Sequence, residues 1–256
     1  MDQNFTDRGF TDIIKVSVNE ELKNFQKLIY LNTKKYLVEH NDDLTLEEKV
    51  NLNFKEMPSK ELWSKLMETM NNSNELKSLI NAEGIKLAFK KIFENPQPFE
   101  ISTFRARFPS QERAIYNWHQ DEGTWYLSKN DNHLNKYPAT LWLSINGATK
   151  EDSLQLVKFS HKEKLYGHKF VKGQGFFSFE KEKNINPDEI ITIETKPSEC
   201  VIFHPLTIHR SVPVKKISLR PRYTIDIRFF DKEFQPKFKT DFSFRIKKFF
   251  NNRFYK

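Results

Sequence analysis

Two histidines and one aspartate are the side chains of this sequence best suited to hold a metal ion. The segment Trp118-His119-Gln120-Asp121 ends a predicted strand, where side chains at positions i and i+2 project to the same side. An imidazole and a carboxylate that converge there supply two ligands of a 2-His-1-carboxylate face, which holds Fe(II) and leaves coordination positions open. The H-x-D triplet alone is weak evidence, because it arises by chance in many chains. His209, which closes a later predicted strand, is the candidate third ligand.

A buried cation is the second feature with chemical potential. From Arg222 to Phe229 the even positions are polar and the odd positions are apolar, so one face of this predicted strand is polar. If that face lines the interior of a barrel, Arg222 needs an anion, and a bidentate carboxylate is the natural one. If the face is solvated, Arg222 is an ordinary surface residue, and one strand cannot decide between these readings. Arg105 and Arg107, on an early predicted strand, would point inward together and are candidates for binding a substrate anion.

Composition excludes several other classes of site. The single cysteine, Cys200, rules out an internal disulfide and a multi-cysteine zinc cluster, so a metal must be held by histidine and carboxylate. Neither G-x-G-x-x-G nor G-x-x-x-x-G-K occurs, which argues against enzymes with a glycine-rich phosphate loop. No apolar run is long enough for a transmembrane segment, and the N-terminus lacks the apolar stretch of a secretory signal. We therefore expect a cytoplasmic protein.

The elements that position these residues fall into three parts of one expected domain. The chain has 256 residues with 38% hydrophobic residues and 24 Phe, enough for a sizeable core. Residues 1–95 are predicted to be mainly helical, with a helix over about 18–39 behind a Ser17-x-x-Glu20 capping box. Further helices are expected near Thr45, after Pro58 and over 75–93.

Residues 96–231 are predicted to form a β-rich catalytic core. Short runs of β-branched and aromatic residues follow one another here, broken by Pro, Gly, Asn or Asp. Their number fits a double-sheet jelly roll, with the helices covering one outer face. The fold class is thus α+β, mainly β. The predicted strands are EISTFRARF, AIYNWHQD, TLWLSING, LQLVKF, GFFSF, IITIETK, CVIFHPLTIH and RYTIDIRFF.

Residues 232–256 form a basic, Phe-rich tail. The chain carries a net charge of +8, and most of the excess lies in this tail, where eight Lys or Arg residues face two acidic ones. An alternative function is therefore a non-catalytic barrel whose tail binds nucleic acid or a membrane surface. A short cationic end is more often a solubilising or packing element, so a small-molecule substrate is the expected partner and nucleic acid is not.

Five segments together resemble the phytanoyl-CoA dioxygenase (PhyH) family of Fe(II)/2-oxoglutarate oxygenases. They are WHQD, TLWLSINGAT, LQLVKFSHK, CVIFHPLTIHRS and PRYTIDIRF, in this order within about 99–230, with weaker support from FTDRGFTDIIKVSVNEEL. The resemblance implies a cupin-like double-stranded β-helix that uses Fe(II), 2-oxoglutarate and O₂. It places the iron ligands on His119, Asp121 and His209. It also places the far carboxylate of 2-oxoglutarate on Arg222 and Ser211, with Trp142 beside the co-substrate.

The same resemblance bears on the reaction and the substrate. Related halogenases lack the carboxylate ligand, so the presence of Asp121 favours hydroxylation. The interval between His209 and the arginine is longer than usual, which makes Arg220 a rival for the carboxylate clamp; Arg222 is preferred because it follows Pro221 and opens the alternating strand. The stretch after Asp121, which includes Trp125, is expected to face the substrate. The cationic segment HKEKLYGHKFVKGQG would suit an acidic or phosphorylated small molecule, although a solvated loop is the simpler reading.

Overall fold

The computed structural model describes most of the chain. The described residues are 1–38, 42–56, 58–99, 102–108, 117–123, 138–171, 176–179, 184–213 and 220–233. Trp125 and nearly all of the basic tail lie outside them, as does the first part of the predicted strand AIYNWHQD. The roles expected for those residues remain predictions. Among the described residues, no helix is long and apolar enough to cross a membrane.

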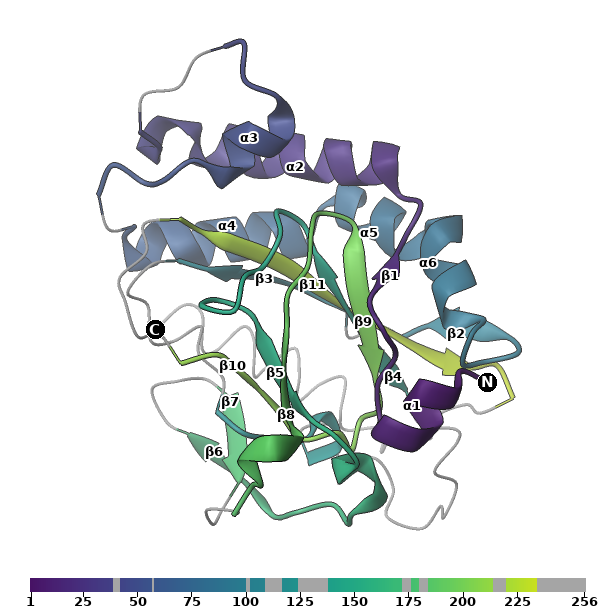
Figure 1. The fold of residues 1–256 in the computed structure, drawn as a ribbon. Coiled ribbons are helices and arrows are strands. Elements are labelled where there is room, and N and C mark those ends of the chain that lie inside the picture. The colour runs from purple at the N-terminus through teal and green to yellow at the C-terminus, as the bar shows by residue number, and fades with distance from the viewer. Residues whose placement is uncertain are drawn as a thin grey trace.

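The N-terminal part is helical, as predicted, and its longer helices pack on one face of the largest sheet (Figure 1). Apolar residues at helical spacing give these helices one buried side, for example Leu22, Phe25 and Ile29. The helices are α1 (Gln3–Arg8), α2 (Asn19–Thr33) with the 3₁₀ turn η1 (Lys34–Tyr36), α3 (Leu46–Asn51), α4 (Lys60–Asn71), α5 (Asn74–Asn81) and α6 (Glu83–Phe89).

Two details of the predicted helices are wrong. The Ser17 capping box does not form, because α2 begins after Val18 and has no side-chain cap. A capping box forms instead at Thr45, whose hydroxyl accepts from the Glu48 amide while the Glu48 carboxylate accepts from the Thr45 amide. The predicted helix over 75–93 is divided at the extended residue Ala82. This break lets Gly84 approach the Ser17 backbone so closely that a Cβ on Gly84 would lie 2.4 Å from the Ser17 carbonyl oxygen.

The strands form the two facing sheets of a jelly roll, which confirms the expected fold class. In the larger sheet, β11 (Arg222–Asp231) pairs antiparallel with β4 (Ala139–Ser144) on one side and with β3 (Thr103–Arg107) and β2 (Pro96–Pro98) on the other. β9 (Glu199–Phe203) joins β4, and β1 (Ile14–Lys15) joins β9. The second sheet has the order β10-β5-β8, from His209–Ser211, Leu154–Val157 and Ile190–Ile193.

The remaining elements are short. β6 (His168–Val171) and β7 (Phe176–Phe179) form a separate hairpin (Figure 1). The described residues also form the 3₁₀ turns η3 (Asp121–Gly123), η4 (Ser160–Lys162) and η5 (Pro187–Glu189). The sequence did not predict β1, β2 or β6. β1 is only two residues long, and β2 is an edge strand that carries two prolines, a residue type that sheets tolerate only at such edges.

The alternation of β11 separates an apolar core from a polar interior. Its odd residues Tyr223, Ile225, Ile227 and Phe229 are buried against the helices, where the rings of Phe229 and Phe89 stack with centroids 4.4 Å apart. Its even residues point to the other face of the sheet, and three of them, Arg222, Thr224 and Arg228, are also buried. The polar face therefore lies inside the roll, and the solvated alternative is wrong.

Candidate metal centre

A direct backbone contact brings the two histidines of the candidate site together. His119 and His209 form an antiparallel bridge in which each amide donates to the other's carbonyl over 3.0 Å. Their rings lie 4.1 Å apart between centroids. Because His209 begins β10, this bridge joins the segment that carries His119 and Asp121 to the second sheet.

The two imidazoles are oriented by the same kind of hydrogen bond. Nδ1 of His119 lies 2.7 Å from the Asn117 carbonyl, and Nδ1 of His209 lies 2.9 Å from the Thr207 carbonyl. A carbonyl accepts only, so each Nδ1 carries the proton and each Nε2 is left as the electron-pair donor. This arrangement is typical of metal-binding histidines. Burial, followed by the nearby His209, holds the pKa of His119 well below its ordinary value, so this ring is neutral.

Asp121 completes the cluster. It begins η3, and its Oδ1 lies 3.7 Å from Nε2 of His209. One potential ligand atom from each of His119, Asp121 and His209 lies within 4.8 Å of the others, and all three residues are buried. Two imidazoles with one carboxylate are a donor set that suits a divalent first-row metal such as iron.

Two residues that sequence analysis did not single out hold the other oxygen of Asp121. Thr140 donates its hydroxyl to Oδ2 over 2.6 Å, and Nη2 of Arg228 lies 3.5 Å from the same atom. Burial alone would raise the pKa of Asp121, but Arg228, the two imidazoles and the Thr140 hydroxyl outweigh it and lower the pKa to about 2. The carboxylate is therefore ionised at neutral pH. By contrast, burial and the charge of Asp121 raise the pKa of Glu122 to about 8, so Glu122 is mainly protonated.

His168 is a further residue whose place the sequence did not reveal. Its Nδ1 donates to the Tyr166 carbonyl over 2.7 Å, and its Nε2 accepts from the Gln120 amide over 2.9 Å. The ring thus fixes the backbone between the two candidate ligands of the H-x-D triplet. The sequence gave no signal for this role of His168, because the contact joins residues 48 positions apart.

Arg222 lies on the same interior face of the large sheet. It is buried beside Trp142, with its guanidinium carbon 5.6 Å from the centre of the indole ring. Within the described part of the chain, its Nε has no hydrogen-bond partner. Burial, with a smaller effect of Arg107, lowers the pKa of Arg222 to about 10, so the group stays cationic at neutral pH. Ser211, at the end of β10, is also buried.

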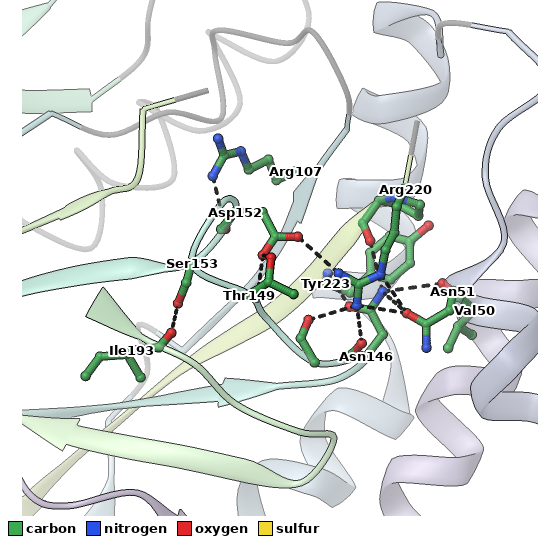
Figure 2. A network of polar contacts seen from close by, with 12 residues as sticks. Val50, Asn51, Arg107, Asn146, Thr149, Asp152, Ser153, Ile193, Arg220 and Tyr223 are labelled. Carbon is green, nitrogen blue, oxygen red and sulfur yellow. Dashed lines mark hydrogen bonds and ion pairs between the residues drawn. The ribbon is translucent and has the colours of Figure 1, made fainter. Parts of the chain in front are cut away.

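Arg220, the rival of Arg222, is occupied by structural contacts (Figure 2). Its Nε and Nη2 donate to the Asn51 side-chain oxygen, and Nη1 pairs with Asp152 Oδ2 over 3.1 Å. Nη2 also donates to the backbone carbonyls of Asn146 and Gly147. Arg220 therefore ties α3 to the loop that follows β4.

The two arginines expected to bind substrate differ from each other. Arg105 pairs with Asp226, with Nε 3.1 Å from Oδ2. Arg107 is more deeply buried and donates to the carbonyls of Asp152 and Val212 over 3.0 and 2.9 Å. Both point to the interior face, as the sequence predicted.

A comparison with known protein families identifies the family of this chain. Residues 5–220, most of the chain, match the sequence profile described as Phytanoyl-CoA dioxygenase (PhyH). The chain belongs to the phytanoyl-CoA dioxygenase family. The resemblance seen in the sequence is therefore confirmed. No protein with a curated function matches the sequence significantly.

Several solved structures share the fold of this PhyH-family chain. ThoJ, a non-heme monooxygenase in its apo form, is 14% identical with a TM-score of 0.61, over 91% of this chain and 78% of ThoJ. The epimerase SnoN, solved with Fe³⁺, alpha ketoglutarate and nogalamycin RO, is 12% identical with a TM-score of 0.56, over 89% of this chain and 81% of SnoN. EvdO2 from Micromonospora carbonacea var. aurantiaca, complexed with 2-oxoglutarate, is 14% identical with a TM-score of 0.54, over 93% of this chain and 91% of EvdO2.

Proposed function

We propose that this PhyH-family protein is an Fe(II)/2-oxoglutarate-dependent dioxygenase that hydroxylates a small-molecule metabolite. The observation that carries the proposal is the meeting of His119, Asp121 and His209 inside the roll, with both Nδ1 atoms tied to carbonyls. Such a donor set needs no rearrangement of the tautomers to accept a metal. Family membership supports the choice of iron and 2-oxoglutarate.

Each protein group has a role in this proposal. The ionised Asp121 and the two imidazoles would hold the iron, while Arg222 and Ser211 would take the far carboxylate of 2-oxoglutarate and Trp142 would form one wall of its pocket. Arg222 is preferred over Arg220 because Arg220 is engaged by Asn51 and Asp152. Iron with 2-oxoglutarate and O₂ supplies the oxidising chemistry, and the protein supplies orientation and exclusion of water.

Hydroxylation is the reaction that we propose within this group of enzymes. Proteins with the same fold include a monooxygenase, an epimerase and a carbocyclase, so the fold alone does not choose the outcome. Asp121 would supply the carboxylate ligand that a halogenase lacks, so its position would not be left to a halide. Hydroxylation predicts succinate release together with a product that gains one oxygen atom.

We also propose that the substrate is acidic or phosphorylated. The support comes from Lys162, Lys164 and Lys169, which are exposed around η4 and the start of β6. Exposed cations on a protein surface raise the local concentration of anionic ligands. Raising the ionic strength should then weaken substrate capture, and a neutral substrate would not show this dependence.

Anaerobic titration tests the core of the proposal. Addition of Fe(II) and then 2-oxoglutarate to the purified protein is expected to produce the weak visible charge-transfer band of the chelate. His209→Ala, which removes one of three proposed ligands, should abolish the band, whereas Arg210→Met, the neighbouring change, should retain it. Absence of the band in the wild type, or its persistence in His209→Ala, would contradict the assignment.

A further inference from the structure

We infer that Arg107 and Arg222 together form a two-guanidinium site for the far carboxylate of 2-oxoglutarate, so that Arg107 serves the co-substrate rather than the substrate. This inference rests on the proposed function, because it concerns the same co-substrate. The sequence suggested a different role for Arg107, as a residue that meets a substrate anion.

The register of the large sheet places the two arginines side by side. Arg222 of β11 and Arg107 of β3 are direct partners in the antiparallel ladder. Side chains of such partners project to the same face, with Cβ atoms about 5 Å apart. Both side chains lie on the interior face and both residues are 5% exposed.

The hydrogen bonds of Arg107 direct it toward Ser211. Its Nη2 donates to the carbonyl of Val212, the residue after Ser211, and its Nη1 donates to the carbonyl of Asp152. Arg107 therefore spans from the large sheet to the end of β10, and Figure 2 shows its contact with Asp152. These two bonds use neutral carbonyls, so the positive charge of Arg107 is not compensated by them.

The carboxylates nearby are already engaged. Asp152 accepts from Arg220 and from the Thr149 amide, and Asp226 pairs with Arg105. Among the residues that the structure describes, neither Arg107 nor Arg222 has an ion pair. Asp152 and Asp226 act on these arginines only at longer range. Two adjacent buried cations that lack an ion-paired carboxylate are costly unless an anion binds between them. The pKa of Arg222, which burial and then Arg107 lower to about 10, is consistent with this proximity.

The test compares two keto acids that differ only at the far end. 2-Oxoglutarate carries a carboxylate there, and 2-oxovalerate, of equal chain length, carries a methyl group. Dissociation constants are measured by anaerobic titration of the charge-transfer band in the Fe(II)-loaded wild type, Arg107→Met, Arg107→Lys and, as a control, Arg210→Met. Arg210→Met removes an equal charge at another place, because the Arg210 guanidinium lies over the Trp118 ring, 4.2 Å from the ring centre.

Loss of Arg107 should act on the carboxylate alone. In Arg107→Met we expect the affinity for 2-oxoglutarate to fall about tenfold or more, because one charge near the carboxylate is lost, while that for 2-oxovalerate changes less than about twofold. Arg107→Lys keeps the charge, so its affinity for 2-oxoglutarate should lie between those of the wild type and Arg107→Met. If Arg107→Met fails to fold, Arg107→Lys replaces it in the comparison. Arg210→Met should match the wild type.

Two outcomes overturn the inference. If Arg107→Met and Arg107→Lys weaken the binding of both keto acids equally, Arg107 only holds the two sheets together. If neither variant changes 2-oxoglutarate binding, Arg107 does not reach the carboxylate. Both outcomes leave the proposed function standing, because the wild-type band is present. A wild type that gives no band with 2-oxoglutarate overturns both proposals.

Discussion

Nη2 of Arg228 lies 3.5 Å from Oδ2 of Asp121, and both side chains are buried. The Thr140 hydroxyl holds the same oxygen, so the other oxygen, Oδ1, is the one that faces His209. Arg228 also lies 3.8 Å from Asp226, which Arg105 engages in turn. A line of alternating charges therefore runs along the interior face of the sheet and ends at the proposed metal ligand.

Removing Arg228 should make the protein depend on metal for stability. In Arg228→Met the buried Asp121 carboxylate loses its ion pair, and we expect the free energy of unfolding of the metal-free protein to fall by about 3 kcal/mol. A bound cation compensates the same charge, so Co(II) should raise the melting temperature of this variant more than that of the wild type. Asp121→Asn combined with Arg228→Met should recover much of the metal-free stability. An equal effect of Co(II) on both proteins would refute the coupling.

Asp121 should also make the metal-free protein sensitive to acid. Its pKa is depressed from 3.8 to about 2, so it favours folding above the ordinary pKa, and this contribution is lost as the pH falls through the folded pKa. The difference corresponds to about 2 kcal/mol, which the wild type should lose between about pH 5 and pH 2. Urea unfolding of the wild type and Asp121→Asn across this range measures it. Plotted against pH, the free energies of unfolding of the two proteins should converge toward low pH. Parallel curves would show that Asp121 is not the group responsible for the acid sensitivity.

Substitution of Arg220 should reduce stability, whereas substitution of Arg222 should reduce the affinity for 2-oxoglutarate. Arg220→Met breaks the contacts with Asn51 and Asp152 and is expected to cost about 3 kcal/mol of stability, because a paired, half-buried charge network is lost. Arg222→Met removes a buried cation beside Trp142 and should leave the stability of the protein unchanged or raise it by about 1 kcal/mol. Its affinity for 2-oxoglutarate should nevertheless fall about a hundredfold, equivalent to about 3 kcal/mol. Thermal unfolding and band titration of both variants separate the two roles, and the reverse pattern would assign the clamp to Arg220.

Gly84 is required by the packing of α6 on the chain before α2. A methyl group at this position would meet the Ser17 carbonyl oxygen at 2.4 Å, so the backbone must shift. We expect Gly84→Ala to destabilise the protein by about 2 kcal/mol despite the better helix propensity of alanine. Lys86→Ala, in the same helix, should change the melting temperature little, and similar melting temperatures for the two variants would contradict the packing argument.

The sequence predicted the features that depend on local spacing. The H-x-D triplet and the alternation from Arg222 onward identified side chains that the structure places inside the roll. Asp121 reaches the site from the 3₁₀ turn η3, however, and not from the predicted strand. Thr140 and Arg228 were missed, although both lie on polar positions of predicted strands. Their roles come from contacts with a residue 19 and 107 positions away, which periodicity along one strand cannot reveal. The break at Ala82 was also missed, because alanine is a strong helix former and gives no local stop signal.

The backbone bridge places His119 and His209 so that one bound ion would cross-link two distant parts of the chain. The ion would close a covalent loop of 90 residues (209 minus 119) between a segment beside the large sheet and a strand of the smaller one. Closing so long a loop restricts the denatured chain in the way that a disulfide does, and by the chain-entropy estimate such a link is worth about 4.6 kcal/mol. This protein has one cysteine and no internal disulfide, so the proposed ion would act as a reversible cross-link between the two sheets. Loss of that ion would then reduce stability as well as the proposed activity.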